Sequence, residues 1–184
     1  MRWQELFDDL EAQFDAVAAA EVAAEISDRT RRETALIRLV DRLRPSIGQQ
    51  IWLRLAGPGA IQGRLTAVGP DWLLLDEIAG REVVVNMPAV LSIAGLSAQS
   101  SAGDATPNVA ARLTLSYALR GLARDRSPVT ACYTDGSTSA GTLDRVGADF
   151  VEIAEHPPGE ARRRDSVRAV RTVPFGSLSS LRRA

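Results

Sequence analysis

Residues 51–77 read IWLRLAGPGAIQGRLTAVGPDWLLLDE, and residues 129–155 read VTACYTDGSTSAGTLDRVGADFVEIAE. The two stretches align without a gap at a constant offset of 78 residues. The alignment places Gly63 on Gly141, Leu65 on Leu143, Asp71 on Asp149, and Trp72 on Phe150. After ten inserted residues it resumes, with VVNMPAVLSI (84–93) over TVPFGSLSSL (172–181). The chain therefore contains an internal repeat, and each copy is expected to form one structural unit.

Each copy has the pattern of five short antiparallel strands. Ile51, Leu53 and Leu55 alternate with polar or small neighbours, which is typical of a half-buried strand. Asp135-Gly136 indicates a tight hairpin, because this pair readily takes positive φ. Five strands within about 45 residues predict a strongly curved sheet that closes as a small SH3-like barrel.

Helical spacing precedes each barrel. The apolar positions before the first barrel are Leu36, Ile37, Val40 and Leu43, with Pro45 as the stop. Those before the second are Leu115, Ala118, Leu119 and Leu122, with Asn108 as a candidate N-cap and Pro128 as the stop. Thr30-x-x-Glu33 is a candidate capping box, so we expect a helix break near residues 27–30. A single long helix is the alternative.

These patterns predict an α+β fold, in which N-terminal helices are followed by two tandem small barrels, each made of a helix and five strands. Residues 97–107, SAQSSAGDATP, are small and polar enough to form a flexible linker. The expected segments are an N-terminal helical segment (1–30), a helix with the first barrel (31–96), the linker (97–107), and a helix with the second barrel (108–184).

Composition places the chain among ordinary globular proteins, with 45% apolar and 24% charged residues. No apolar run approaches the ~20 residues that cross a bilayer, and the N-terminus does not resemble a secretory signal. The single cysteine, Cys132, agrees with a reducing compartment. We therefore expect a cytoplasmic protein without a membrane partner. All 22 basic residues are arginine, which we attribute to composition bias because it pervades the chain.

The plan G-x-L-x-x-V-G-x-D-aromatic, which begins at Gly63 and again at Gly141, resembles the Sm and Sm-like proteins. The resemblance covers residues 36–93 and 112–181 and implies their small-barrel fold. The polar residues with which that family binds RNA are replaced here by Gly69 and Gly147, by Leu73 and Val151, and by Asn86-Met87 and Pro174-Phe175. The resemblance therefore implies no family-type uridine pocket. The chain also resembles actinobacterial proteins sometimes labelled Fis-type regulators, although no helix-turn-helix supports that label.

Catalytic chemistry has little support in the sequence. His156 is the only histidine, and we interpret it as a solvated loop residue. Cys132 is interpreted as a buried, inert thiol, because a nucleophile needs a nearby base. Asp71 and Asp149 follow turn glycines, so hydrogen bonds to the turn backbone explain them better than a catalytic pair. We expect neither an enzyme nor a cofactor, a metal site or a small-molecule substrate.

Two surfaces are candidates for binding. The first is an apolar stripe at helical spacing, formed by Trp3, Leu6, Phe7, Leu10, Phe14 and Val17. It either packs on the chain's own barrels or associates with another chain. The second is an insertion found only in the second barrel, with the candidate phosphate-contacting residues Arg162, Arg163, Arg164 and Arg168. A solvated charged loop is the other interpretation of this insertion.

The leading hypothesis is a non-catalytic adaptor or scaffold that binds protein, or itself, through the N-terminal helices and the barrel faces. The alternative is a nucleic-acid-binding regulator that uses the arginine loop of the second barrel. The acidic pI and the absence of base-reading residues favour the first hypothesis. The basic C-terminal region favours the second.

Overall fold

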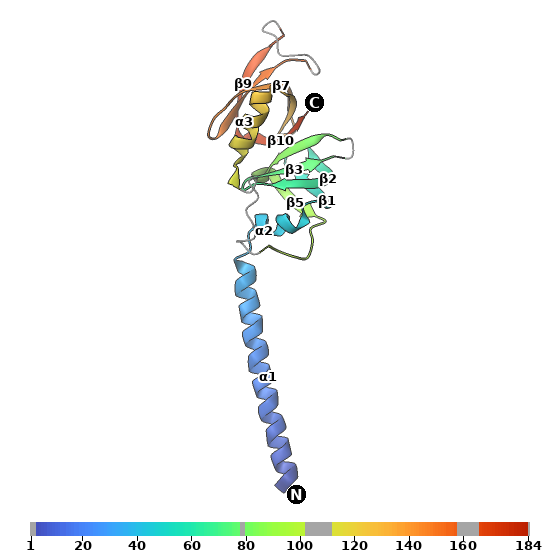
Figure 1. The fold of residues 1–184 in the computed structure, drawn as a ribbon, viewed down its shortest axis with the longest axis vertical. Helices are drawn as coiled ribbons and strands as arrows, with labels where there is room; N and C mark the ends of the chain where they lie inside the picture. The colour runs from blue at the N-terminus through green and yellow to red at the C-terminus, as the bar shows by residue number, and fades with distance from the viewer. Residues whose placement is uncertain (1–2, 78–79, 102–111, 158–165, 184) are drawn as a thin grey trace. The chain divides into compact units, whose positions relative to one another are not determined.

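The computed structural model of the protein describes residues 3–77, 80–101, 112–157 and 166–183. Within these ranges the fold is α+β, with three α-helices and one antiparallel sheet of ten strands. The chain divides into two compact units, Met1–Arg38 and Leu39–Ala184 (Figure 1). The predicted α+β class is therefore confirmed.

Helix α1 spans Trp3–Ala35 without interruption, so the predicted break near residues 27–30 is wrong. Thr30 does not cap a new helix, because its hydroxyl donates a hydrogen bond back to the Ile26 carbonyl at 2.8 Å. Ion pairs one turn apart, Arg29 with Glu33 and Arg31 with Asp28, lie within the same stretch. Such pairs stabilise a continuous helix by a few tenths of a kcal/mol each, roughly 0.2–0.5. No helix in the described ranges is both long and apolar enough to cross a membrane.

The second unit begins with a short helix, α2 (Leu39–Leu43), and a 3-10 turn, η1 (Arg44–Ser46), that contains Pro45. Val40 and Leu43 are buried in the first repeat's core, whereas Leu36 is 81% exposed. The predicted helix before the first barrel is therefore shorter than its apolar spacing suggested. The side chain of Arg42 donates hydrogen bonds to three backbone carbonyls of residues 97–99, so the start of the predicted linker is attached to α2.

Each repeat contributes five strands to the sheet. Those of the first are β1 (Gln50–Leu55), β2 (Gly59–Val68), β3 (Trp72–Asp76), β4 (Glu82–Asn86) and β5 (Val90–Ala94). Those of the second are β6 (Pro128–Tyr133), β7 (Thr138–Val146), β8 (Phe150–Glu155), β9 (Ala169–Pro174) and β10 (Leu178–Arg183). The 3-10 turns η2 (Met87–Ala89) and η4 (Phe175–Ser177) precede the fifth strand of each repeat.

The strand order is β5-β1-β2-β3-β4-β10-β6-β7-β8-β9. Both repeats therefore follow one order, in which the fifth strand lies beside the first and the fourth strand lies at the far side. In the described residues the sheet stays open, with β5 at one edge and β9 at the other, and no strand pairing closes either half. The predicted closure of each repeat into a small barrel is therefore not confirmed.

The glycines shared by the two repeats lie where a side chain would collide with a neighbour. A Cβ on Gly69 would lie 2.1 Å from the Trp72 indole nitrogen, and one on Gly147 would lie 2.3 Å from the Phe150 ring. A Cβ on Gly141 would lie 2.0 Å from the Ala154 carbonyl oxygen. The two repeats therefore share one packing arrangement, in which the aromatic ring lies against the glycine turn that precedes it.

The two repeats meet where β4 pairs with β10, with Leu181 opposite Val84. The Asn86 side chain donates hydrogen bonds to the carbonyls of Phe175 and Leu178, both at 2.8 Å. Two ion pairs also cross the junction: Arg182 with Glu77 at 3.1 Å, and Arg183 with Glu82 at 3.6 Å. Backbone pairing, amide hydrogen bonds and ion pairs thus join the repeats into one sheet.

Helix α3 (Leu115–Asp125) belongs to the second repeat but is anchored on the first. The backbone N–H of Leu115 donates to the Asp71 carboxylate at 2.8 Å, so Asp71 binds the start of α3 rather than its own turn as predicted. The Trp72 indole N–H donates to the Leu113 carbonyl at 2.7 Å. Trp72 is only 6% exposed and packs in the core of the second repeat, with Leu119 of α3.

This arrangement predicts that Trp72 contributes more to stability than its counterpart Phe150. Trp72→Ala should lower the free energy of unfolding by ~3–5 kcal/mol, because it empties a buried site. Trp72→Phe should cost less, roughly 1–3 kcal/mol, because it leaves the Leu113 carbonyl unpaired and fills only part of the indole's site. Phe150→Ala should cost less than Trp72→Ala, since Phe150 is half-buried. Equilibrium unfolding in urea measures these losses, and equal losses for the two alanine variants would contradict the assignment.

Candidate functional site

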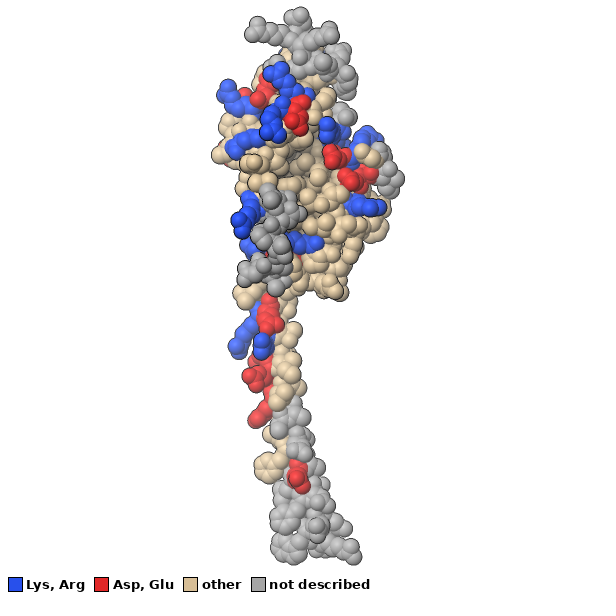
Figure 2. All heavy atoms as spheres, in the orientation of Figure 1, with Lys and Arg blue, Asp and Glu red and all other residues tan. Residues whose placement is uncertain are grey.

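The predicted apolar stripe lies entirely on α1. Phe14 and Val17 are 74% and 58% exposed, and Val22 and Ile26, further along the helix, are exposed as well. The side chains of the other four stripe residues, Trp3, Leu6, Phe7 and Leu10, lie outside the described ones. Figure 2 shows charged side chains along one side of α1 toward its C-terminal end, with uncharged ones on the other. The described side chains of the stripe are thus not buried by contacts within the unit that α1 forms.

Strand β5 forms the first edge of the sheet and carries the sequence VLSIA, without a charged residue or a proline. Leu91 is 63% exposed. On the neighbouring strand, Trp52 lies opposite Ala94, is 47% exposed, and packs against Gly95. An uncharged edge strand flanked by an exposed indole can accept another strand.

The other edge, β9, has a different character. It carries Arg171, ends in Pro174, and exposes Val170. Arg171 forms an ion pair with Glu155 of β8, with 2.6 Å between Nε and Oε1. The Glu155 carboxylate raises the pKa of this guanidinium by hydrogen bonding and by its charge. Charge and proline are features by which proteins protect a sheet edge against strand addition.

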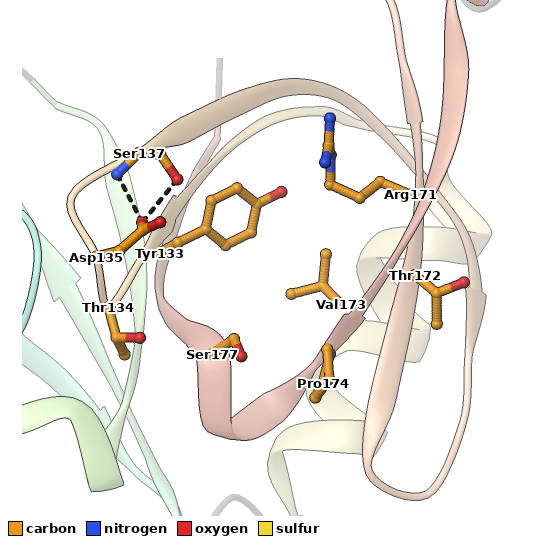
Figure 3. A pocket seen from close by; sticks show the side chains of 9 residues that line it. All are labelled: Tyr133, Thr134, Asp135, Ser137, Arg171, Thr172, Val173, Pro174 and Ser177. Carbon is orange, nitrogen blue, oxygen red and sulfur yellow. Dashed lines mark hydrogen bonds between the residues drawn. The ribbon is translucent and has the colours of Figure 1, made fainter.

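A hollow of 360 Å³ lies between the β6–β7 turn and β9 in the second repeat (Figure 3). Tyr133, Asp135, Arg171 and Val173 are among its lining residues. The matching strand residues of the first repeat, Leu55, Val83 and Val85, are almost completely buried apolar side chains. The second repeat has therefore replaced part of a packed core by an open, polar surface.

Hydrogen bonds fix the polar rim of this hollow. The Asp135 carboxylate accepts bonds from the Ser137 hydroxyl at 2.6 Å and from the Ser137 backbone N–H at 2.8 Å (Figure 3). These bonds, the hydroxyl's first, lower the pKa of the Asp135 carboxyl below its usual value. The Tyr133 and Ser139 hydroxyls are hydrogen-bonded to each other.

A second hollow of 320 Å³ also involves Arg171 and is lined by His156 and Arg168 among others. His156 is only 3% exposed, so its interpretation as a solvated loop residue is wrong. Its backbone N–H still bonds to the Ala140 carbonyl, which holds the residue at the end of the β7–β8 ladder. Arg168 is exposed, whereas the predicted phosphate contacts Arg162, Arg163 and Arg164 lie outside the described residues.

Sequence reasoning did not single out Trp52, Leu91, Tyr133 or Arg171. The repeat itself carries the signal for them, because each differs in kind from its counterpart. Trp52 matches Thr130, Leu91 matches Ser179, Tyr133 matches Leu55, and Arg171 matches Val83. Positions where one copy of a repeat departs from the shared core pattern are where binding surfaces are best sought.

Other site chemistry is limited in the part of the chain that the structure describes. Cys132 is buried on β6, and its sulfur accepts a hydrogen bond from the Arg182 guanidinium at 3.4 Å. No group of three histidine, cysteine, aspartate or glutamate side chains in those residues could hold a metal ion. No protein-family model matches the chain, and no curated protein matches it.

The Asp135 hydrogen bonds give a testable pH dependence. Because the pKa of Asp135 is lowered in the folded state, the stabilisation is present above the unfolded pKa and is lost as the pH falls through the folded one. Ser137→Ala removes the hydroxyl and should raise the Asp135 pKa toward its usual value, as measured by NMR titration of the carboxyl carbon. Ser139→Ala is the control and should leave that pKa unchanged. A pKa that does not respond to Ser137→Ala would show that the hydroxyl is not its cause.

Proposed function

We propose that the protein is a non-catalytic, cytoplasmic interaction scaffold that binds protein, including other copies of itself. Each repeat is proposed to be a small five-stranded unit of the Sm-like type that is left open between its fourth and fifth strands. The common strand order of the two repeats and their shared glycine and aromatic positions support this proposal. In this proposal the barrels do not act through the family's RNA pocket, since the residues that would form it are replaced.

The observation that carries the proposal is the exposed apolar surface of α1. The helix has 33 residues, and the described side chains of its apolar face, such as Phe14 and Val17, are exposed. Phe14 and Val17 also belong to a series with alternating spacings of four and three residues, which begins at Trp3 and Phe7. This spacing is that of helices which pair along one face. Because isolated helices gain little stability in water, pairing would also stabilise α1.

Charged substitutions on this face test the proposal. Phe14→Glu combined with Val17→Glu should convert an assembled protein into a smaller species, because charges in a helix–helix seam oppose pairing. The control is Arg29→Gln combined with Arg32→Gln, which changes the net charge by the same amount. It acts outside the apolar series of α1, so the assembly should remain. Light scattering coupled to gel filtration measures both molar masses.

A wild-type protein that is monomeric at all accessible concentrations, and that captures no protein partner through α1, would contradict the proposal. So would an unchanged molar mass for the Phe14→Glu and Val17→Glu double variant. Aggregation of that variant, instead of clean dissociation, would show that the stripe packs within the chain's own fold.

One observation favours nucleic-acid binding as a second candidate function. Arg168 and Arg171 line the same hollow as His156, at the base of the segment that contains the other three insertion arginines. Glu155, which pairs with Arg171, also lines this hollow and reduces its positive charge. A few arginines neutralise only a few phosphates, so any binding should be modest and strongly dependent on salt.

The test is fluorescence anisotropy with labelled single-stranded RNA and DNA. If this candidate is right, replacing Arg162, Arg163 and Arg164 by serine should abolish binding at low salt. The matched control replaces Arg29, Arg31 and Arg32 of α1 by serine and should leave binding intact. We expect no binding by the unmodified protein even at low salt, which would eliminate this candidate. Binding that survives the loop substitution would point to another surface.

A further inference from the structure

The internal junction shows how a fifth strand of this repeat accepts a neighbour. Strand β10 is paired on one side with β6 and on the other with β4 of the first repeat. Its counterpart β5 is paired on one side with β1 in the same way, but its other side is a free sheet edge in the described residues. Ser179 and Ser180 of β10 are completely buried, whereas their counterparts Leu91 and Ser92 are exposed.

We propose that this free edge pairs with the β5 strand of a second copy of the chain. The two β5 strands would lie antiparallel about a two-fold axis and extend the ten-stranded sheets into one. This inference rests on the proposed scaffold function and identifies a partner and a surface for it. It concerns an edge of the sheet, which is a different surface from α1.

The composition of β5 supports strand addition. Val90–Ala94 contains no charge and no proline, and Leu91 is 63% exposed. Trp52, on the strand next to it, adds a half-exposed indole. Natural proteins protect free edges with charged residues or proline, and an apolar edge without them is prone to pair with another strand. Pairing with a specific partner strand would satisfy the unpaired backbone N–H and C=O groups of this edge and would prevent non-specific strand addition.

The opposite edge does not provide the matching surface for β5. In the internal junction Asn86 donates two hydrogen bonds to the η4–β10 segment, but its counterpart on β9 is Pro174. Val83 of β4 is replaced on β9 by Arg171. A head-to-tail arrangement, in which β9 of one chain pairs with β5 of another, would therefore lack the amide contacts and meet a charged strand.

The ion pairs of the internal junction are also absent from a head-to-tail arrangement. Arg182 and Arg183 of β10 correspond to Ala94 and Gly95 at the end of β5. Glu82, the partner of Arg183, corresponds to Val170. Because β5 has no counterpart of Arg182 or Arg183, it is complementary to an uncharged strand. Of the two edge strands of the sheet, only β5 itself is uncharged. A surface that complements itself gives a closed two-fold dimer.

Cysteine cross-linking in the full chain tests this pairing directly. Leu91→Cys, Ser92→Cys, Ile93→Cys and Ala94→Cys each place a thiol along β5. In a two-fold antiparallel pair only the residue on the axis faces its own copy, so these four variants cover the registers centred on residues 91–94. Opposed residues in antiparallel strands have Cα atoms about 4.5–5.5 Å apart, which suits a disulfide. Under mild oxidation, at least one variant should form a linked dimer roughly 100-fold faster than random collision at micromolar protein concentration allows.

Two controls accompany these variants. The wild-type protein reports on Cys132, which is 4% exposed and should react slowly. Val170→Cys places a thiol at an exposed position on β9, and its rate includes any increase that comes from α1 bringing the chains together. If no β5 variant links faster than Val170→Cys, the proposal is wrong. If a mixture of Ser92→Cys and Val170→Cys links faster than any β5 variant alone, the chains pair head to tail, which also overturns it.

A matched pair of glutamate variants separates this inference from the proposed function. Leu91→Glu should weaken association through β5 several-fold in Kd, because it adds a charge to the apolar pairing strand of both chains. Val170→Glu makes the same change at the other edge and should have no effect. If neither variant alters association while the Phe14→Glu and Val17→Glu double variant still dissociates the protein, the β5 dimer is wrong and the scaffold function stands.

Discussion

The pairing of β4 with β10 is the interaction on which the rest of the structure depends. It turns two five-stranded repeats into one sheet, and the contacts around it all link one repeat to the other. Asn86 bonds to the turn before β10, and Arg182 pairs with Glu77. Asp71 and Trp72 of the first repeat hold the start of α3. Without this junction α3 would lose its anchor, and Trp72 would lose part of its packing.

The same junction determines where the molecule can bind others. By using the fourth strand of one repeat and the fifth of the other, it leaves a fifth strand and a fourth strand free at the two ends. These ends have diverged. Strand β9 carries Arg171 and Pro174, whereas β5 is uncharged and exposes Leu91. Duplication supplied two similar edges, and substitution has made one of them resistant to pairing and left the other open to it.

Local chemistry explains which features could be predicted from the sequence. Turn glycines such as Gly69 act on the residues beside them, so the repeat predicted the strands and the turns between them, and α3 was found by its spacing. The capping-box pattern at Thr30 favoured a helix break, and a single long helix was only the alternative. The ion pairs one turn apart favour the continuous helix that is observed, and the capping pattern alone does not show which effect is stronger. The pairing of β4 with β10 and the burial of His156 depend on residues far apart in the chain. Periodicity in one segment carries no information about such contacts.

Amide hydrogen exchange at the junction tests this account most directly. If β4 and β10 are paired, the amides of Val84 and Leu181 should be protected as strongly as those of the central strands β2 and β7, and should exchange only on global unfolding. Protection at the junction that is lost well before that of β2 and β7 would mean that the two repeats open independently. That result would contradict a single sheet joined through β4 and β10.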